Sequence, residues 1–119
     1  MDNAALLEKA GVEIVIAEIG NAHNARNARQ EAGIAVAYGL SPSTALEALT
    51  SNPAEIFGVD ARYGTVAKGK VANLVVWPED PFELSSFPTQ VWVRGEIVPD
   101  DSRHKQLRDR YLDLSKFKP

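Results

Sequence analysis

Residues 45–77 contain the pattern that decides the fold: Ala-Leu-Glu-Ala-Leu-Thr at 45–50, Asn-Pro-Ala-Glu-Ile-Phe-Gly at 52–58, and Gly-Thr-Val-Ala-Lys-Gly-Lys-Val-Ala-Asn-Leu-Val-Val-Trp at 64–77. The first two pieces predict two short helices in tandem. The third predicts a turn followed by an apolar strand. We expect its two glycines to adopt positive φ, a conformation that a side chain would penalise.

The ends of the two helices are marked by residue type. Ser41 is predicted to cap the first helix, with Pro42 at its first position. Asn52 is the expected cap of the second helix, in a variant of the capping box that pairs it with Glu55. Gly58 is expected to end that helix.

Upstream, the chain predicts a helix, a strand and a second helix. Residues 4–10 have helical composition and Gly11 follows as a stop signal. Val12–Ala17 is a β-branched apolar run, typical of a strand buried on both faces. Ala25–Tyr38 predicts a helix with a stripe of small side chains, which indicates close approach to a neighbouring surface.

Downstream, residues 90–94 and 96–98 predict two strand segments around a tight turn at Gly95. A loop rich in proline, residues 78–88, separates them from the preceding strand. From Ser102 onward we expect a helix. Its predicted buried residues are Leu107, Tyr111, Leu112 and Leu114.

Length and composition narrow the possible functions. The chain has 119 residues, whereas a complete barrel of eight strand–helix units needs about 250. A net charge of −3 without a basic stripe argues against nucleic-acid binding. There is no cysteine for disulfide or thiolate chemistry. The apolar runs are too short to span a membrane and the N-terminus does not resemble a signal peptide, so we expect a soluble cytoplasmic protein.

Seven ordered elements resemble the C-terminal signature of the metal-dependent amidohydrolase superfamily. They are Val12–Ala17, Ala25–Tyr38, Ser43–Thr50, Pro53–Phe57, Gly64–Trp77, Asp80-Pro81-Phe82 and Val91–Gly95. The segment His23-Asn24-Ala25-Arg26-Asn27 followed by Gln30-Glu31-Ala32 is similar to the imidazolonepropionase-like and prolidase-like branch.

The resemblance implies an α/β fold, which as an isolated chain is α+β. Residues 1–58 would form the last helix–strand–helix portion of a TIM-type barrel with its exit helices. Residues 59–99 would supply the C-terminal strands of a small β-sandwich, and residues 100–119 a C-terminal helix.

The resemblance also implies chemistry that this chain does not carry. Family members hold zinc or another divalent metal with histidines from earlier strands and an aspartate that ends the last strand. Here Ile19 stands where the family has that aspartate, so we predict no catalytic residue and no metal ligand in this chain. Glu18 would replace the aspartate only with a one-residue shift, which points its side chain to the other face. Of the two histidines, His23 is a candidate substrate contact or a hydrogen-bonding loop residue, and His104 is expected on the surface.

Two functions follow from these observations. The first is a C-terminal fragment of an amidohydrolase-family hydrolase acting on amide, cyclic amide or dipeptide-like carbon–nitrogen bonds, inactive alone and completed by a complementing barrel chain. The alternative is a non-catalytic, self-associating scaffold or interaction module derived from that fold. The apolar strand Val12–Ala17 needs strand neighbours, so a homo-oligomer is expected in that case. Neither function involves nucleic acid or a membrane.

Overall fold

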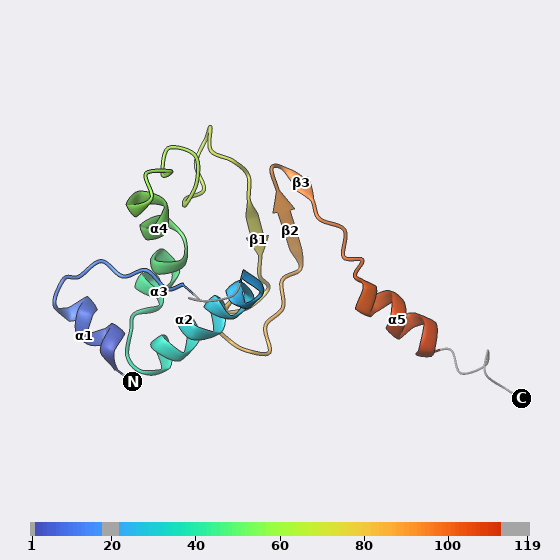
Figure 1. Cartoon of the computed structure of the whole chain (residues 1–119), viewed down its shortest axis with the longest axis horizontal. Coiled ribbons are helices and arrows are strands. Elements are labelled where there is room, and N and C mark those ends of the chain that lie inside the picture. The colour runs from blue at the N-terminus through green and yellow to red at the C-terminus, as the bar shows by residue number, and fades with distance from the viewer. Residues whose placement is uncertain (1, 18–21, 113–119) are drawn as a thin grey trace, which may run out of the picture.

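Short helices form the N-terminal half of the structure, and a small sheet lies in the C-terminal half (Figure 1). The computed structural model describes residues 2–17 and 22–112. The helices and strands in these residues are α1 (Asn3–Lys9), the 3-10 helix η1 (Ala22–Asn27), α2 (Ala28–Ala37), α3 (Pro42–Leu49), α4 (Ser51–Ile56), β1 (Leu74–Val76), β2 (Gln90–Val93), β3 (Glu96–Ile97) and α5 (Arg103–Leu112).

The centre of the helical half is a close contact between α2 and α3. Ala32 on α2 and Ala45 and Ala48 on α3 are all 0% exposed. They form one buried cluster with Ile14 and Leu40. This confirms that the small side chains of the second predicted helix allow a close approach to a neighbour.

The predicted cap of α3 is correct, and the predicted cap of α4 is wrong. Ser41 Oγ accepts a hydrogen bond from the amide of Thr44 at 3.2 Å, and Pro42 is the first residue of α3. At α4 the N-cap position is Thr50, and Asn52 lies inside the helix. Its amide nitrogen instead donates to the carbonyl oxygen of Ile14 at 2.9 Å. A long-range partner therefore takes the side chain that local capping rules assigned to the helix end.

The prediction of a β-strand at Val12–Ala17 is also wrong. Residues 12–17 have no strand assignment and pair with no strand in the described part of the chain. A strand needs a neighbour that continues the backbone ladder. Here the amide of Ile16 donates to the carbonyl of Ala48 at 3.1 Å, so helix ends occupy the positions that a strand would take.

The sheet has the order β1-β2-β3 and both pairs are antiparallel. Arg94 and Gly95 connect β2 to β3 with φ of 54° and 85°, which are the two positive values of a tight hairpin turn. Asn73 Oδ1 accepts a hydrogen bond from the amide of Arg94 at 2.9 Å. The predicted hairpin is confirmed, and Asn73 links its turn to β1.

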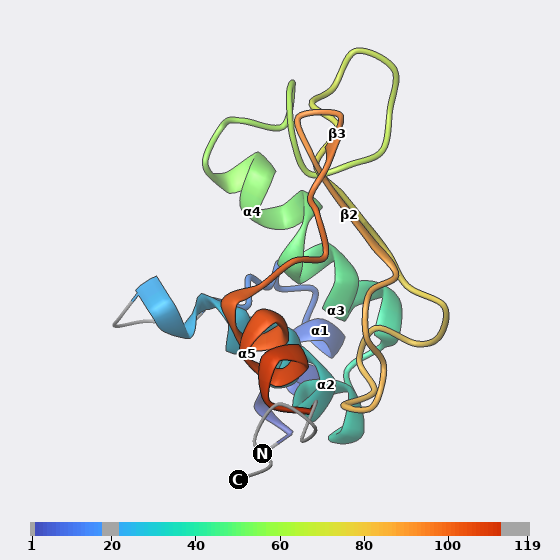
Figure 2. The same cartoon turned by 90° about the vertical axis from the view of Figure 1, so that its right-hand side faces the viewer.

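The C-terminal helix forms as predicted, but its expected buried residues are exposed. Leu107, Tyr111 and Leu112 are 38%, 55% and 69% exposed, and Leu114 lies outside the described residues. Figure 1 places α1 and α5 at opposite ends of the longest axis, and in Figure 2 α5 points toward the viewer. The predicted helix is confirmed, but α5 stands away from the rest of the structure, so its apolar side chains are not buried.

None of the helices within residues 2–17 and 22–112 is both long enough and apolar enough to cross a membrane.

The turn after α4 explains why its first glycine is required. Gly64 and Gly69 both have φ of +90°, as predicted. A Cβ added at Gly64 would lie 2.6 Å from the Cβ of Ala54 and 3.1 Å from the carbonyl oxygen of Thr50, whereas one at Gly69 would meet nothing within 4 Å. Gly64 therefore allows the turn to lie directly on α4.

The helix α1 is attached to the start of α3 through a carboxylate. Ser41 Oγ donates to Glu8 Oε1 at 2.5 Å, and the Ser41 amide donates to Glu8 Oε2 at 3.2 Å. The hydrogen bond from the Ser41 hydroxyl, assisted by Thr44, holds the pKa of Glu8 below its usual value. The ionised form of Glu8 is thus the one that binds α3.

Gly64→Ala should destabilise the fold more than Gly69→Ala. Each alanine in the left-handed region costs about 1–2 kcal/mol, and only at Gly64 does overpacking against α4 add about 1–3 kcal/mol. Urea denaturation of the two variants and the wild type measures the difference. Equal losses would contradict the contact between the turn and α4.

Glu8 should make stability depend on pH in the acid range. Because its pKa is lower in the folded state, its stabilising effect is complete above the unfolded-state pKa, near 4.5, and is lost as the pH falls through the folded-state value. We expect Glu8→Gln and Ser41→Ala each to flatten the loss of thermal stability on acidification. An acid profile of Glu8→Gln that is parallel to that of the wild type would rule out this link.

Candidate functional site

The junction of α3 and α4 holds the backbone of residues 14–16, which precede the predicted catalytic position in the sequence. The backbone of Ile14 accepts from Asn52, and that of Ile16 donates to Ala48. The side chain of Ile14 is 8% exposed and belongs to the alanine cluster. These contacts fix the backbone of residues 14–16. Ile19 and Glu18, on which the predicted loss of catalysis rests, lie outside the described residues.

The two histidines belong to separate parts of the structure. His23 is in η1 and His104 is in α5, and both side chains are exposed. Helix α5 lies at the far end of the molecule from the helical half (Figure 1). The structure does not bring the two imidazoles together, and the proposed substrate contact at His23 stays a prediction.

The described residues do not fit the divalent metal that the resemblance implies. Within residues 2–17 and 22–112 no three side chains of His, Cys, Asp or Glu are grouped so that they could share an ion. A zinc site takes three or four such ligands. We therefore derive no chemical step that passes through a metal.

Arg29 connects the helical half to the loop after β1. Its Nη1 donates to the carbonyl of Pro81 at 2.6 Å and to that of Glu83 at 2.9 Å. Its guanidinium carbon lies 5.1 Å from the centre of the Trp77 ring, within the range of a cation–π contact. No role was assigned to Arg29 from the sequence, and this contact was therefore missed.

The Asp80-Pro81-Phe82 piece of the signature shapes the loop that Arg29 binds. Asp80 Oδ1 accepts from the amide of Phe82 at 2.8 Å, which closes an Asx turn. The carbonyl of Phe82 then lies against α2, where a Cβ on Gly33 would come within 2.7 Å of its oxygen. The signal available in the sequence was the spacing of Arg29 and Gly33, four residues apart on one helix face.

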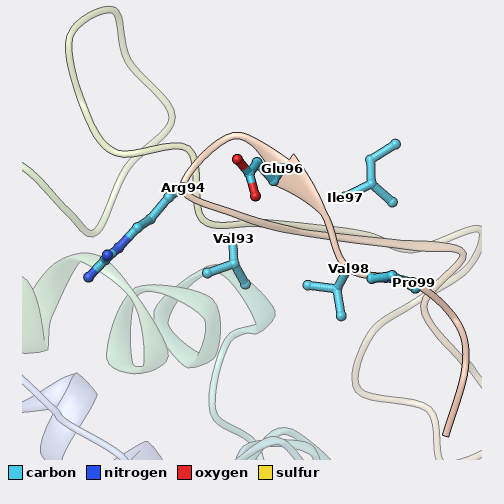
Figure 3. A pocket seen from close by; sticks show the side chains of 6 residues that line it. All are labelled: Val93, Arg94, Glu96, Ile97, Val98 and Pro99. Atoms are coloured by element: carbon cyan, nitrogen blue, oxygen red, sulfur yellow. The ribbon is translucent and has the colours of Figure 1, made fainter.

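A shallow depression lies on the β2–β3 hairpin (Figure 3). In Figure 3 the side chains of Val93 and Val98 lie below the ribbon, and that of Ile97 lies above it. The lining residues are Val93, Arg94, Glu96, Ile97, Val98 and Pro99. None of the residues predicted to act in catalysis or binding lines it, so the depression is not the predicted site.

Comparison with known families gives a match over most of the chain. The model described as "Amidohydrolase family" matches residues 1–98. Among solved structures, an amidohydrolase from Thermotoga maritima MSB8 superposes with a TM-score of 0.74 at 35% sequence identity, over 82% of this chain and 26% of that one.

Curated relatives match over shorter stretches. Amidohydrolase tasK of Hapsidospora irregularis is 37% identical over 78 residues, which are 66% of this chain and 8% of that protein. Adenine deaminase 2 of Jannaschia sp. is 34% identical, over 60% of this chain and 11% of that protein. Imidazolonepropionase of Serratia proteamaculans is 38% identical, over 50% of this chain and 16% of that protein. The chain thus spans a small part of the length of each relative.

Replacing Arg29 should loosen the loop on α2. Arg29→Ala removes two charge-assisted hydrogen bonds and a ring contact, and we expect a loss of about 2–3 kcal/mol in the free energy of unfolding. Arg29→Lys should recover only part of this loss, because lysine lacks the planar guanidinium. Arg26→Ala, on the exposed preceding turn, is the control and should change stability by less than about 0.5 kcal/mol. Chemical denaturation measures all three variants. An Arg29→Ala variant with the same free energy of unfolding as the wild type would contradict a stabilising role for the contact.

Proposed function

Because the chain belongs to the amidohydrolase family, we propose that it forms the C-terminal scaffold of a hydrolase acting on carbon–nitrogen bonds and has no hydrolytic activity alone. The bonds in question are amides, cyclic amides or dipeptide-like linkages. The names of the relatives, which include imidazolonepropionases and an adenine deaminase, support this class of substrate. The role proposed for this chain is to position the end of the last barrel strand.

The observation that carries the proposal is the small buried core of the structure beside its many exposed apolar side chains. In the described residues seven apolar residues are buried, and five of them are alanines. The radius of gyration is 18.1 Å, whereas a compact chain of this length has about 13–14 Å. Large side chains such as Phe57 and Phe87 are 74% and 73% exposed. Such a surface is expected of a part that packs against a larger body.

The contacts of the helical half support a positioning role. Asn52 and Ala48 hold the backbone of residues 14–16, and Arg29 and Gly33 hold the loop after β1 against α2. A hydrolase of this family would need both segments in fixed places, since one leads toward the predicted catalytic position and the other packs the sandwich portion against α2. We propose that a complementing barrel chain supplies the metal ligands, because the described residues group none.

A chimera tests the proposal. In it residues 1–98 of this chain replace the matching part of the Thermotoga maritima amidohydrolase. We expect the chimera to fold but to remain inactive with added Zn²⁺, because Ile19 can neither bind a metal nor move a proton. Ile19→Asp in the chimera should restore hydrolysis, whereas Glu18→Asp, the adjacent control, should not.

Two results would reject the proposal. One is zinc-dependent hydrolysis by the 119-residue chain alone. The other is a folded chimera in which Ile19→Asp stays as inactive as Glu18→Asp, because the missing aspartate would then not explain the inactivity.

A further inference from the structure

Residues 12–17 have one edge that is already covered. The carbonyl of Ile14 and the amide of Ile16 both bond to the α3–α4 junction. In an extended chain the backbone groups of alternate residues face the same edge. The alternation at Ile14 and Ile16 is that of an extended chain, from which we infer that the groups of Glu13, Val15 and Ala17 face the opposite edge. Within the described residues no strand pairs with that edge.

The surroundings of this segment favour a polypeptide partner. A groove runs along residues 14–17 between α1 and α2, and its walls include Leu7, Glu31 and Ala35. Leu7 on α1 and Val12 at the start of the segment are 37% and 48% exposed. A free edge flanked by apolar side chains is a template for strand addition.

We propose that the chain alone forms a two-fold dimer in which residues 13–17 of two copies pair as antiparallel strands centred on Val15. Each copy would exchange backbone hydrogen bonds through Glu13, Val15 and Ala17. Because the α3–α4 junction covers the other edge, the pairing closes at two copies and cannot extend into a fibre.

The charge and side chains of the segment are compatible with a second copy in this register. With Val15 on the two-fold axis, Glu13 of one copy lies opposite Ala17 of the other, so the two copies of Glu13 are not directly opposite each other. A register centred on Glu13 would place two carboxylates directly opposite each other, which is unfavourable. Val15 pairs with its own counterpart, and β-branched residues suit such a cross-strand contact. The segment is thus compatible with a second copy of itself.

This inference goes beyond the proposed function, which it neither requires nor replaces. A complementing barrel chain would pair with the same edge, and the dimer would be the state of the chain without it. A monomeric chain would overturn the dimer and leave the chimera experiment unaffected.

Two substitutions at the exposed Ala17 test the register, because they should change the dimer Kd in opposite directions. Ala17→Lys places a cation opposite Glu13 of the second copy, and Ala17→Glu places a carboxylate there. Because the two-fold axis repeats the pair, we expect the dimer Kd to fall about fivefold for lysine and to rise about fivefold for glutamate. Sedimentation velocity over a concentration series measures the Kd, and circular dichroism of both variants should match the wild type. The wild type should reach twice the monomer mass of 13.0 kDa.

Hydrogen exchange of the wild type adds a readout at the edge itself. The amide of Val15 should gain protection as concentration rises, while that of Ile16, bonded to Ala48, should be protected at every concentration. A monomer throughout, assemblies larger than two, equal Kd values for the two Ala17 variants, or exchange at Val15 that is independent of concentration would each overturn the proposal.

Discussion

The contact between α2 and α3 depends on alanine side chains, and the rest of the helical half depends on that contact. Ala32, Ala45 and Ala48 are fully buried, so a larger side chain at any of them would push the helices apart. The carbonyl of Ala48 is also the acceptor for Ile16. The distance between the helices therefore sets the position of the segment that leads to the predicted catalytic residue.

The same reliance on small residues extends to the sheet. The loop after β1 approaches α2 at Gly33, where even a methyl group would meet the carbonyl of Phe82. Arg29, one helical turn earlier, binds the carbonyls on either side of that point. A glycine that permits contact and an arginine that holds it act together, because close approach alone leaves the carbonyl groups of the loop without donors. Small side chains thus connect the helical half to the sheet without a large apolar core.

Features set by neighbouring residues were predictable from the sequence, and features set by distant partners were not. The cap at Ser41, the positive φ at Gly64 and the turn at Gly95 each follow from residue type and short-range sterics. Asparagine is a typical N-cap residue, yet the partner of Asn52 is a carbonyl 38 positions away in the sequence. Residues 12–17 have the pattern of a buried strand, but a pattern cannot supply the neighbouring strand. The sequence pattern of α5 predicted the helix correctly. It could not show that the helix would have no surface to pack against.

The structure gives a physical reason why the signature identifies the family better than it identifies an activity. Its two parts, the tandem helices and the glycine turn with its strand, contribute Asn52, Gly64 and Asn73 to the contacts that hold the backbone. These contacts depend on geometry and are the same whether residue 19 is an aspartate or an isoleucine. The residue on which the predicted catalysis depends, Ile19, contributes to none of these contacts within the described residues.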